Sequence, residues 1–233
     1  MSAGPATGAE LFQPAALSRF EVTVGGGGVV LGRDQRDQPM TVRLFRDRLT
    51  QVALVTCGYV ARLIAVRALA TGAAVHVATS LGQRWEPVIS TAPQARAMLV
   101  SPGAPLPAGA SPGTPLLRCD DIGPAASPPL PDGGGAVGAW QTRIVVQDLI
   151  PATAVATLRA YDLLVLQRVR PELVQPLQST FGLPAQLADA LPALPDDMVV
   201  MLAPGAPGRA TAVWLAPTEF ETWLLGAPVR LEG

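Results

Sequence analysis

The sequence predicts an α/β protein of the three-layer, Rossmann-like class, with a mixed, mostly parallel sheet, helices on both faces and an antiparallel edge. Three observations carry this prediction. Between Val52 and Thr79 the apolar pattern changes from a β-branched run to a helical spacing and back, which is typical of a parallel βαβ unit. The last third of the chain alternates strands with helices that open with proline. Two β-branched runs flank the short loop 203–208, which indicates an antiparallel hairpin.

The βαβ unit defines the central elements. Residues 51–56 and 74–79 are expected as buried strands, because both are rich in β-branched and small apolar residues. Between them, residues 58–70 place apolar side chains three or four positions apart, the spacing of a helix with one broad buried face. Gly72 follows this helix and suits a left-handed cap.

The elements on either side of this unit follow from turn residues and short apolar runs. A run of glycines predicts a hairpin between strands at 19–24 and 29–31. Residues 40–45 add a further strand. After the unit, a short helix is expected within 92–99, running into a strand near 98–100.

The second half of the chain is predicted to alternate strands and helices. The strands are expected at 116–119, 142–147, 161–167, 196–202 and 211–215. The helices are expected at 151–159, 171–181, 184–191 and 218–225. Most of these helices begin at proline, whose missing N–H costs nothing in the first turn, and Gly182 separates two of them.

The domain organisation follows from composition. Residues 1–18 and 227–233 are expected to be tails around a single α/β domain at 19–226. Within it, 17 of the 39 residues in 101–139 are Gly or Pro, which predicts a loop excursion interrupted by one strand. The apolar stretch 52–79 is not expected to cross a membrane, because arginines interrupt it.

Composition excludes several functions. Basic and acidic residues number 17 and 18, which argues against a general nucleic-acid or polybasic membrane binder. All the basic residues are arginine, so neither a Schiff-base lysine nor a P-loop lysine exists. One histidine and two cysteines, His76, Cys57 and Cys119, are too few for a disulfide scaffold or a zinc site. No metal is therefore expected.

The turn between the first strand and helix of the βαβ unit is the place where a Rossmann fold binds phosphate. Gly58 and Ala61 match the last two positions of the G-x-G-x-x-G/A pattern, whereas Thr56 replaces its first glycine. No acidic residue follows the second strand to bind a ribose. Close packing of the helix on its sheet is the interpretation that the residues favour, and cofactor binding by Thr56, Gly58 and Ala61 is the alternative.

The remaining polar residues suggest no catalytic centre. His76 lies in the middle of a predicted buried strand, so a core or edge position is favoured over a dyad with Cys57. The adjacent carboxylates of 120–121 and of 196–197 would point to opposite faces of a strand, and turn or strand-entry roles are expected for them. Trp85 and Trp140 are candidates for a partner surface, with covering of the sheet edge as the alternative.

A family resemblance covers most of residues 18–226. The segments that carry it are Val29–Asp34, Pro39–Phe45, Val52–Thr79 with Arg67–Gly72, Trp140–Arg143, Tyr161–Arg168, Leu183–Pro184, Leu194–Met198 and Leu215–Thr218. They resemble the soluble domain of EccE-type proteins, core components of the type VII (ESX) secretion machinery of actinobacteria. All are fold motifs and none is catalytic.

The resemblance implies a scaffold component that is not an enzyme and binds no cofactor. It implies a position on the cytoplasmic side of the inner membrane, beside EccB, EccC and EccD. EccE proteins usually carry transmembrane helices, which this sequence does not show, so membrane contact would come through partners. The alternative is a Rossmann-type nucleotide-binding protein or enzyme that uses the turn Thr56–Ala61.

Overall fold

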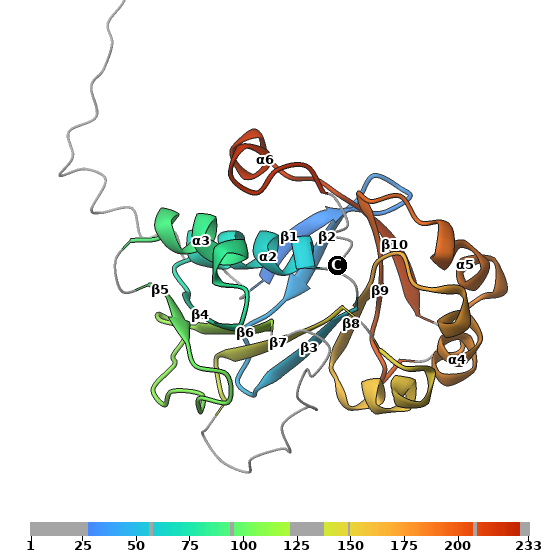
Figure 1. The fold of residues 1–233 in the computed structure, drawn as a ribbon, viewed down its shortest axis with the longest axis horizontal. Coiled ribbons are helices and arrows are strands. Elements are labelled where there is room, and N and C mark those ends of the chain that lie inside the picture. The colour runs from blue at the N-terminus through green and yellow to red at the C-terminus, as the bar shows by residue number, and fades with distance from the viewer. Residues whose placement is uncertain are drawn as a thin grey trace, which may run out of the picture.

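The computed structural model describes residues 28–55, 58–93, 96–121, 138–148, 150–206 and 209–228. Within this part of the chain, ten strands form one sheet in the order β2-β1-β10-β9-β8-β3-β7-β6-β4-β5 (Figure 1). Their bounds are β1 Gly28–Arg33, β2 Pro39–Arg43, β3 Thr50–Val55, β4 Ala74–Thr79, β5 Ala97–Val100, β6 Leu116–Asp121, β7 Gln141–Gln147, β8 Leu163–Leu166, β9 Met198–Leu202 and β10 Ala210–Leu215. The expected strand at 19–24 and both expected tails lie outside, or largely outside, the described residues.

The sheet is parallel on one side and antiparallel on the other. Strands β8, β3, β7, β6, β4 and β5 run parallel to one another. From β8 onwards the pairs β8–β9, β9–β10, β10–β1 and β1–β2 are antiparallel. The predicted mixed sheet with an antiparallel edge is therefore confirmed.

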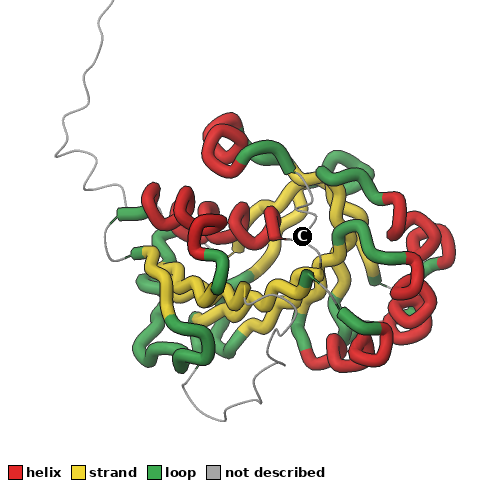
Figure 2. The backbone as a smooth tube through the Cα atoms, in the orientation of Figure 1, coloured by secondary structure: helices red, strands yellow, loops and turns green. Residues whose placement is uncertain are grey.

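Two layers of helices cover the sheet (Figure 2). One face packs against α2 (Gly58–Ala70), α3 (Gly82–Thr91) and α6 (Glu219–Leu225). The other packs against the 3-10 helix η2 (Ala152–Ala160), α4 (Pro171–Phe181), α5 (Ala185–Ala190) and the short η3 (Leu191–Ala193).

The alternation of side chains along the strands divides the interior between these two layers. On β3, Val52 and Leu54 belong to the first core, and Ala53 and Val55 to the second. Both faces of the central strands are buried, which confirms the three-layer class and explains why these strands are almost uniformly apolar.

The βαβ unit is confirmed in its elements and strand direction, but its two strands are not neighbours. Between β3 and β4 the sheet inserts β7 and β6, which come later in the chain. Local periodicity specifies a strand and its helix. The neighbour of a strand depends instead on pairing between segments far apart in the sequence.

The prediction of a helix within 92–99 is wrong. The helix is α3, Gly82–Thr91, and β5 begins at Ala97. Its apolar signal is small, because only Trp85 and Val88 are buried, and Pro87 stands inside it. Proline inside a helix removes a backbone hydrogen-bond donor, so the presence of Pro87 argues against a helix when the sequence alone is considered.

The segment expected as a loop excursion contains β6. Residues 101–115 form turns and bends, and the Pro107 carbonyl accepts a hydrogen bond from Gln141 Nε2 of β7 at 2.7 Å. Residues 122–137 lie outside the described part. No described helix is long and apolar enough to span a bilayer.

Candidate functional site

The start of α2 lies at the carboxyl end of β3, in the middle of the parallel half of the sheet. From β3 the chain crosses by α2 toward β4, whereas from β7 it crosses by η2 to β8 on the other side of β3. The two crossovers use opposite faces. The carboxyl ends of β3 and β7 therefore form a topological switch point, the usual place for a ligand in an open α/β sheet.

The predicted phosphate turn lies at this point. Gly58 is the first residue of α2, and Ala61 is fully buried where the helix packs on the sheet. Thr56 and Cys57 lie outside the described residues. The burial of Ala61 agrees with close packing of the helix on its sheet. The backbone N–H groups at the start of α2 are the donors to which an anion would bind.

An arginine from α3 lies directly at the start of α2. Arg84 Nη1 is 3.5 Å from the place that a Cβ on Gly58 would occupy. The same nitrogen lies 3.5 Å from Asp121 Oδ1, at the end of β6, and 3.7 Å from Asp148 Oδ2, just after β7. The carboxylate of Asp121 is buried, whereas the Asp148 side chain is 37% exposed.

Trp85 supports this cluster from the interior. Its indole Nε1 donates a 2.7 Å hydrogen bond to Asp121 Oδ2, and only 1% of the residue is exposed. Trp85 is therefore not a surface residue of this chain, in contrast to the partner surface expected from the sequence. Trp140 precedes β7, is partly buried against the first core, and donates its backbone N–H to Arg46.

Arg62 is a second cation of this region, one helical turn along α2 from Gly58. It is 8% exposed, and its Nη1 reaches the Arg84 carbonyl oxygen at 3.5 Å. Its Nε is buried and has no hydrogen-bond partner among the described residues. Burial first, and then the charge of Arg84, lower the pKa of Arg62.

Asp120 points to the opposite face of β6 from Asp121, as the alternation predicted. It accepts hydrogen bonds from Arg118 Nε at 2.7 Å and from Arg143 Nε at 2.6 Å, and all three residues are buried. The expected turn or strand-entry role is wrong for Asp120 and Asp121, because both are interior parts of ion pairs. Asp196 and Asp197 do occupy a turn before β9.

The histidine and the described cysteine show no reactive arrangement. His76 is half-buried on β4 beside Arg118 of β6, and burial first, then the Arg118 charge, lower its pKa. Cys119 is fully buried, and burial raises the pKa of its thiol, which makes a thiolate unfavourable. Among the described residues no group of His, Cys, Asp and Glu could hold a metal ion.

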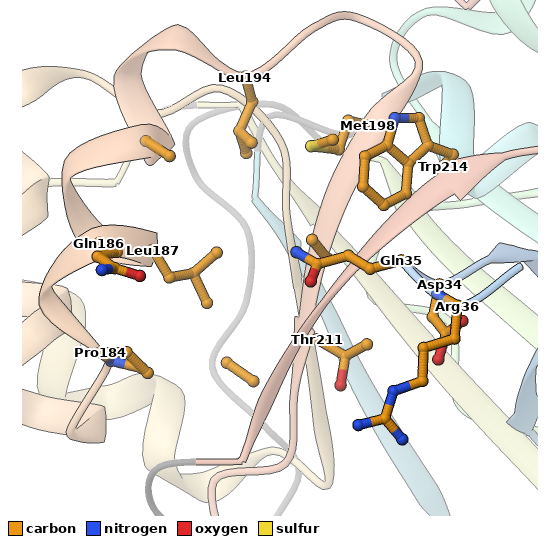
Figure 3. A pocket seen from close by; sticks show the side chains of 13 residues that line it. Asp34, Gln35, Arg36, Pro184, Gln186, Leu187, Leu194, Met198, Thr211 and Trp214 are labelled. Carbon is orange, nitrogen blue, oxygen red and sulfur yellow. Dashed lines mark hydrogen bonds between the residues drawn. The ribbon is translucent and has the colours of Figure 1, made fainter. Parts of the chain in front are cut away.

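A separate cavity of about 490 Å³ lies between α5 and β10, on the antiparallel side of the sheet (Figure 3). Leu187 and Trp214 face it from opposite walls, and Gln35 reaches it from the turn between β1 and β2 (Figure 3). Sequence reasoning missed it, because its walls come from three separate parts of the chain. It contains no ion pair or titratable cluster comparable to that at the start of α2.

The sequence and the structure were compared with those of known proteins. No protein-family model and no curated protein matches the sequence. Among solved structures, the chain resembles the cytoplasmic domain of the Thermomonospora curvata type VII secretion ATPase EccC, with a TM-score of 0.56 and 11% identity over 94% of this chain. It resembles VirB4 of Thermoanaerobacter pseudethanolicus, with a TM-score of 0.54 and 10% identity over 84% of the chain. The cytoplasmic domain of EssC follows, with a TM-score of 0.51 and 12% identity over 90%.

The matched share of these proteins differs. The chain spans 32% of the EccC chain and 47% of the EssC chain, but 98% of the VirB4 chain. At these identities the likeness shows the fold, which agrees with the predicted Rossmann-like α/β class.

These neighbours bear on two sequence predictions. The secretion-system resemblance finds a counterpart in EccC and EssC folds and not specifically in EccE. The prediction that the chain is not an enzyme is contradicted, because the fold is one that secretion ATPases have. That prediction depended on the resemblance to EccE-type proteins, whose shared segments are fold motifs and carry no information about catalysis.

Proposed function

We propose that this chain is a nucleotide-binding domain of the secretion-ATPase type, and that it binds the phosphates of a nucleoside triphosphate at the start of α2. The observation that carries the proposal is the cluster of Arg84, Asp121 and Asp148 around Gly58, at the switch point of the sheet. Charged side chains from three separate strand or helix ends converge there, which core packing alone does not require.

The backbone at this point suits a phosphate group. Gly58 opens a helix of 13 residues, whose first N–H groups have no partner within the helix and carry partial positive charge. A Cβ on Gly58 would meet only Arg84 within 4 Å. An anion can therefore approach the helix start if the Arg84 side chain turns aside or binds it.

The carboxylates extend the likeness to phosphoryl-transfer sites. Asp121 ends the β6 strand, and acidic residues at strand ends hold the nucleotide's magnesium in P-loop proteins. The chain departs from those proteins because it has no lysine for the phosphates. Binding and hydrolysis are thus separate questions for experiment.

The test is calorimetric titration of the purified chain with ATP and magnesium, alongside release of inorganic phosphate. We expect saturable ATP binding that Gly58→Val abolishes, because its methyl groups would fill the approach to the helix start. Gly205→Val is the matched control, since nothing lies within 4 Å of a Cβ at that turn. A folded parent chain that binds no ATP at millimolar concentration, or a Gly58→Val variant that binds as the parent does, overturns the proposal.

The fold likeness to EccC, EssC and VirB4, together with the sequence resemblance to EccE-type proteins, supports a place in a secretion apparatus. We infer a cytoplasmic position and contacts with EccB, EccC or EccD of a type VII system. Co-expression with each tagged component, followed by purification, tests this inference. Capture of this chain by one of them supports the assignment, and capture by none overturns it.

A further inference from the structure

We propose that Arg84, supported by Arg62, binds the phosphate chain of the ligand in place of the lysine that the sequence lacks, so that the site selects polyphosphates by charge and not by base. This inference rests on the proposed nucleotide-binding function. It concerns which side chains provide the affinity and which chemical feature of the ligand they recognise.

Arg84 brings a positive charge to the start of α2, and its two carboxylate partners are held only at long distance. Its guanidinium lies at the start of α2, where the helix carries partial positive charge and attracts anions. Its two carboxylate partners are at 3.5 and 3.7 Å, whereas charge-assisted hydrogen bonds are usually about 2.7–2.9 Å.

Ion pairs elsewhere in the same chain show what close pairing looks like. Arg67 approaches Glu221 at 2.6 Å, and Arg143 approaches Asp120 at 2.6 Å. Compared with these, the guanidinium of Arg84 is loosely paired. It therefore has the reach to turn to a phosphate oxygen at the start of α2.

Arg62 gives a second, independent indication of an anion. It is a buried cation with a partnerless Nε, and its Nη1 makes only a long contact with a carbonyl oxygen. The charge of Arg84 repels that of Arg62, whereas the charge of Asp121 attracts it. The Arg62 guanidinium carbon lies 5.9 Å from the centre of the Tyr59 ring. A buried cation without full pairing is costly, and a phosphate between the two arginines would neutralise both.

The carboxylates of Asp121 and Asp148 compete with a phosphate for the guanidinium of Arg84. Asp121 keeps its hydrogen bond from Trp85 when Arg84 turns away. Asp148 is partly exposed and is held at the longer distance, so we expect the phosphate to displace it first. Removing the charge of Asp148 should consequently strengthen phosphate binding.

The described aromatic residues near the site offer no platform for a base. Trp85 and Tyr59 are buried, so neither ring can stack on a nucleobase. Recognition by the described residues is therefore through charge. Inorganic tripolyphosphate should bind, ATP and GTP should bind alike, and adenosine should not bind.

The experiment compares the parent chain with Arg84→Gln, Arg84→Lys and Asp148→Asn, titrated with ATP, GTP, tripolyphosphate and adenosine. We expect Arg84→Gln to weaken ATP binding at least tenfold, Arg84→Lys to restore part of it, and Asp148→Asn to tighten it severalfold. Arg36→Gln, an exposed arginine at the remote cavity, is the matched control. Circular dichroism melts confirm that each variant is folded at the assay temperature.

The outcomes separate the two proposals. If the parent binds ATP and Arg84→Gln or Asp148→Asn binds it equally well, the role of Arg84 is refuted while nucleotide binding stands. If ATP binds but tripolyphosphate does not, recognition by charge is refuted. If no phosphate ligand binds the folded parent, the proposed function itself fails. Should Arg84→Gln not fold, Arg84→Lys and Asp148→Asn still decide the case.

Discussion

The ion pair between Arg67 of α2 and Glu221 of α6 allows a quantitative test of how the C-terminal helix is attached. Arg67 Nε and Nη2 approach the two Glu221 carboxylate oxygens at 2.6 and 2.7 Å, and the side chains are 14% and 6% exposed. Arg67 also donates to the carbonyl oxygens of Val30 and Ala216. One guanidinium thus joins α2 to β1 and to the chain before α6.

Replacement of Arg67 by Met would leave the Glu221 charge buried without its partner. Breaking a buried pair in this way costs about 3–5 kcal/mol, and partial exposure of Arg67 places the expected loss near the lower value. For a chain of this size a loss of about 3 kcal/mol lowers the melting temperature by roughly 6–12 °C. The double variant Arg67→Met/Glu221→Leu should recover part of the loss, because it removes the unpaired charge as well.

The assay is urea unfolding followed by circular dichroism, together with thermal melts. Arg33→Met is the matched control, because its pair with Asp37 is exposed and pairs of that kind contribute about 0–1 kcal/mol. A free energy of unfolding for Arg67→Met within 1 kcal/mol of the parent, as for the control, would refute the argument that burial makes this pair strong.

Three further predictions concern acid stability, strand packing and protease sensitivity. Burial tends to raise the pKa of Glu221, but the hydrogen bonds from Arg67 and Thr218 outweigh it and lower the pKa below 4.5. The stabilisation from this group is therefore complete above the unfolded-state pKa and is lost as the pH falls through the lower folded-state pKa. In urea unfolding between pH 5 and about 3, the free energy of unfolding should fall more steeply for the parent than for Glu221→Gln. Gly32→Ala should lower the melting temperature strongly, since its Cβ would lie 1.9 Å from the Trp214 carbonyl oxygen, and an unchanged melt would show that β1 and β10 can separate freely. Limited proteolysis should cut within 101–115 or 122–139 before 140–226, because the 101–139 segment is rich in Gly and Pro; first cuts within 161–202, detected by mass spectrometry, would contradict this.

The start of α2 has several features of phosphate sites and differs from them in the origin of its cation. A helix start, a glycine and a strand-end carboxylate are present, but the cation comes from α3 and not from the turn itself. If Arg84 binds phosphate, the site achieves with a side chain from another helix what a P-loop achieves with a local lysine. Affinity would then depend on how α3 packs, which Trp85 and its hydrogen bond to Asp121 control.

Local patterns in the sequence determined many of the elements. The helix over 58–70 has the predicted bounds, because apolar spacing specifies the helix and glycine lies at or just beyond each of its ends. The helix over 171–181 likewise begins at its proline and ends at Gly182, whose φ of 65° is left-handed. Thr218 caps the last helix through a capping box with Glu221, a signal four residues long. Such features need only neighbours along the chain, so periodicity and composition reveal them.

Only the tertiary structure decided which segments meet. The neighbours of β3 are β7 and β8, and Arg84 meets Asp121 across 37 positions of sequence. For Asp120 and Asp121 the sequence predicts turn or strand-entry roles, because adjacent residues of a strand point to opposite faces and form no single site. Their pairing with Arg143 of β7 and Arg84 of α3 depends on elements far away in the chain. The pairing of strands and the neutralisation of buried charge are long-range interactions, whereas hydrophobic periodicity is a local one. The sequence therefore determined the elements and the layer class, and the packing of distant strands decided where charge gathers.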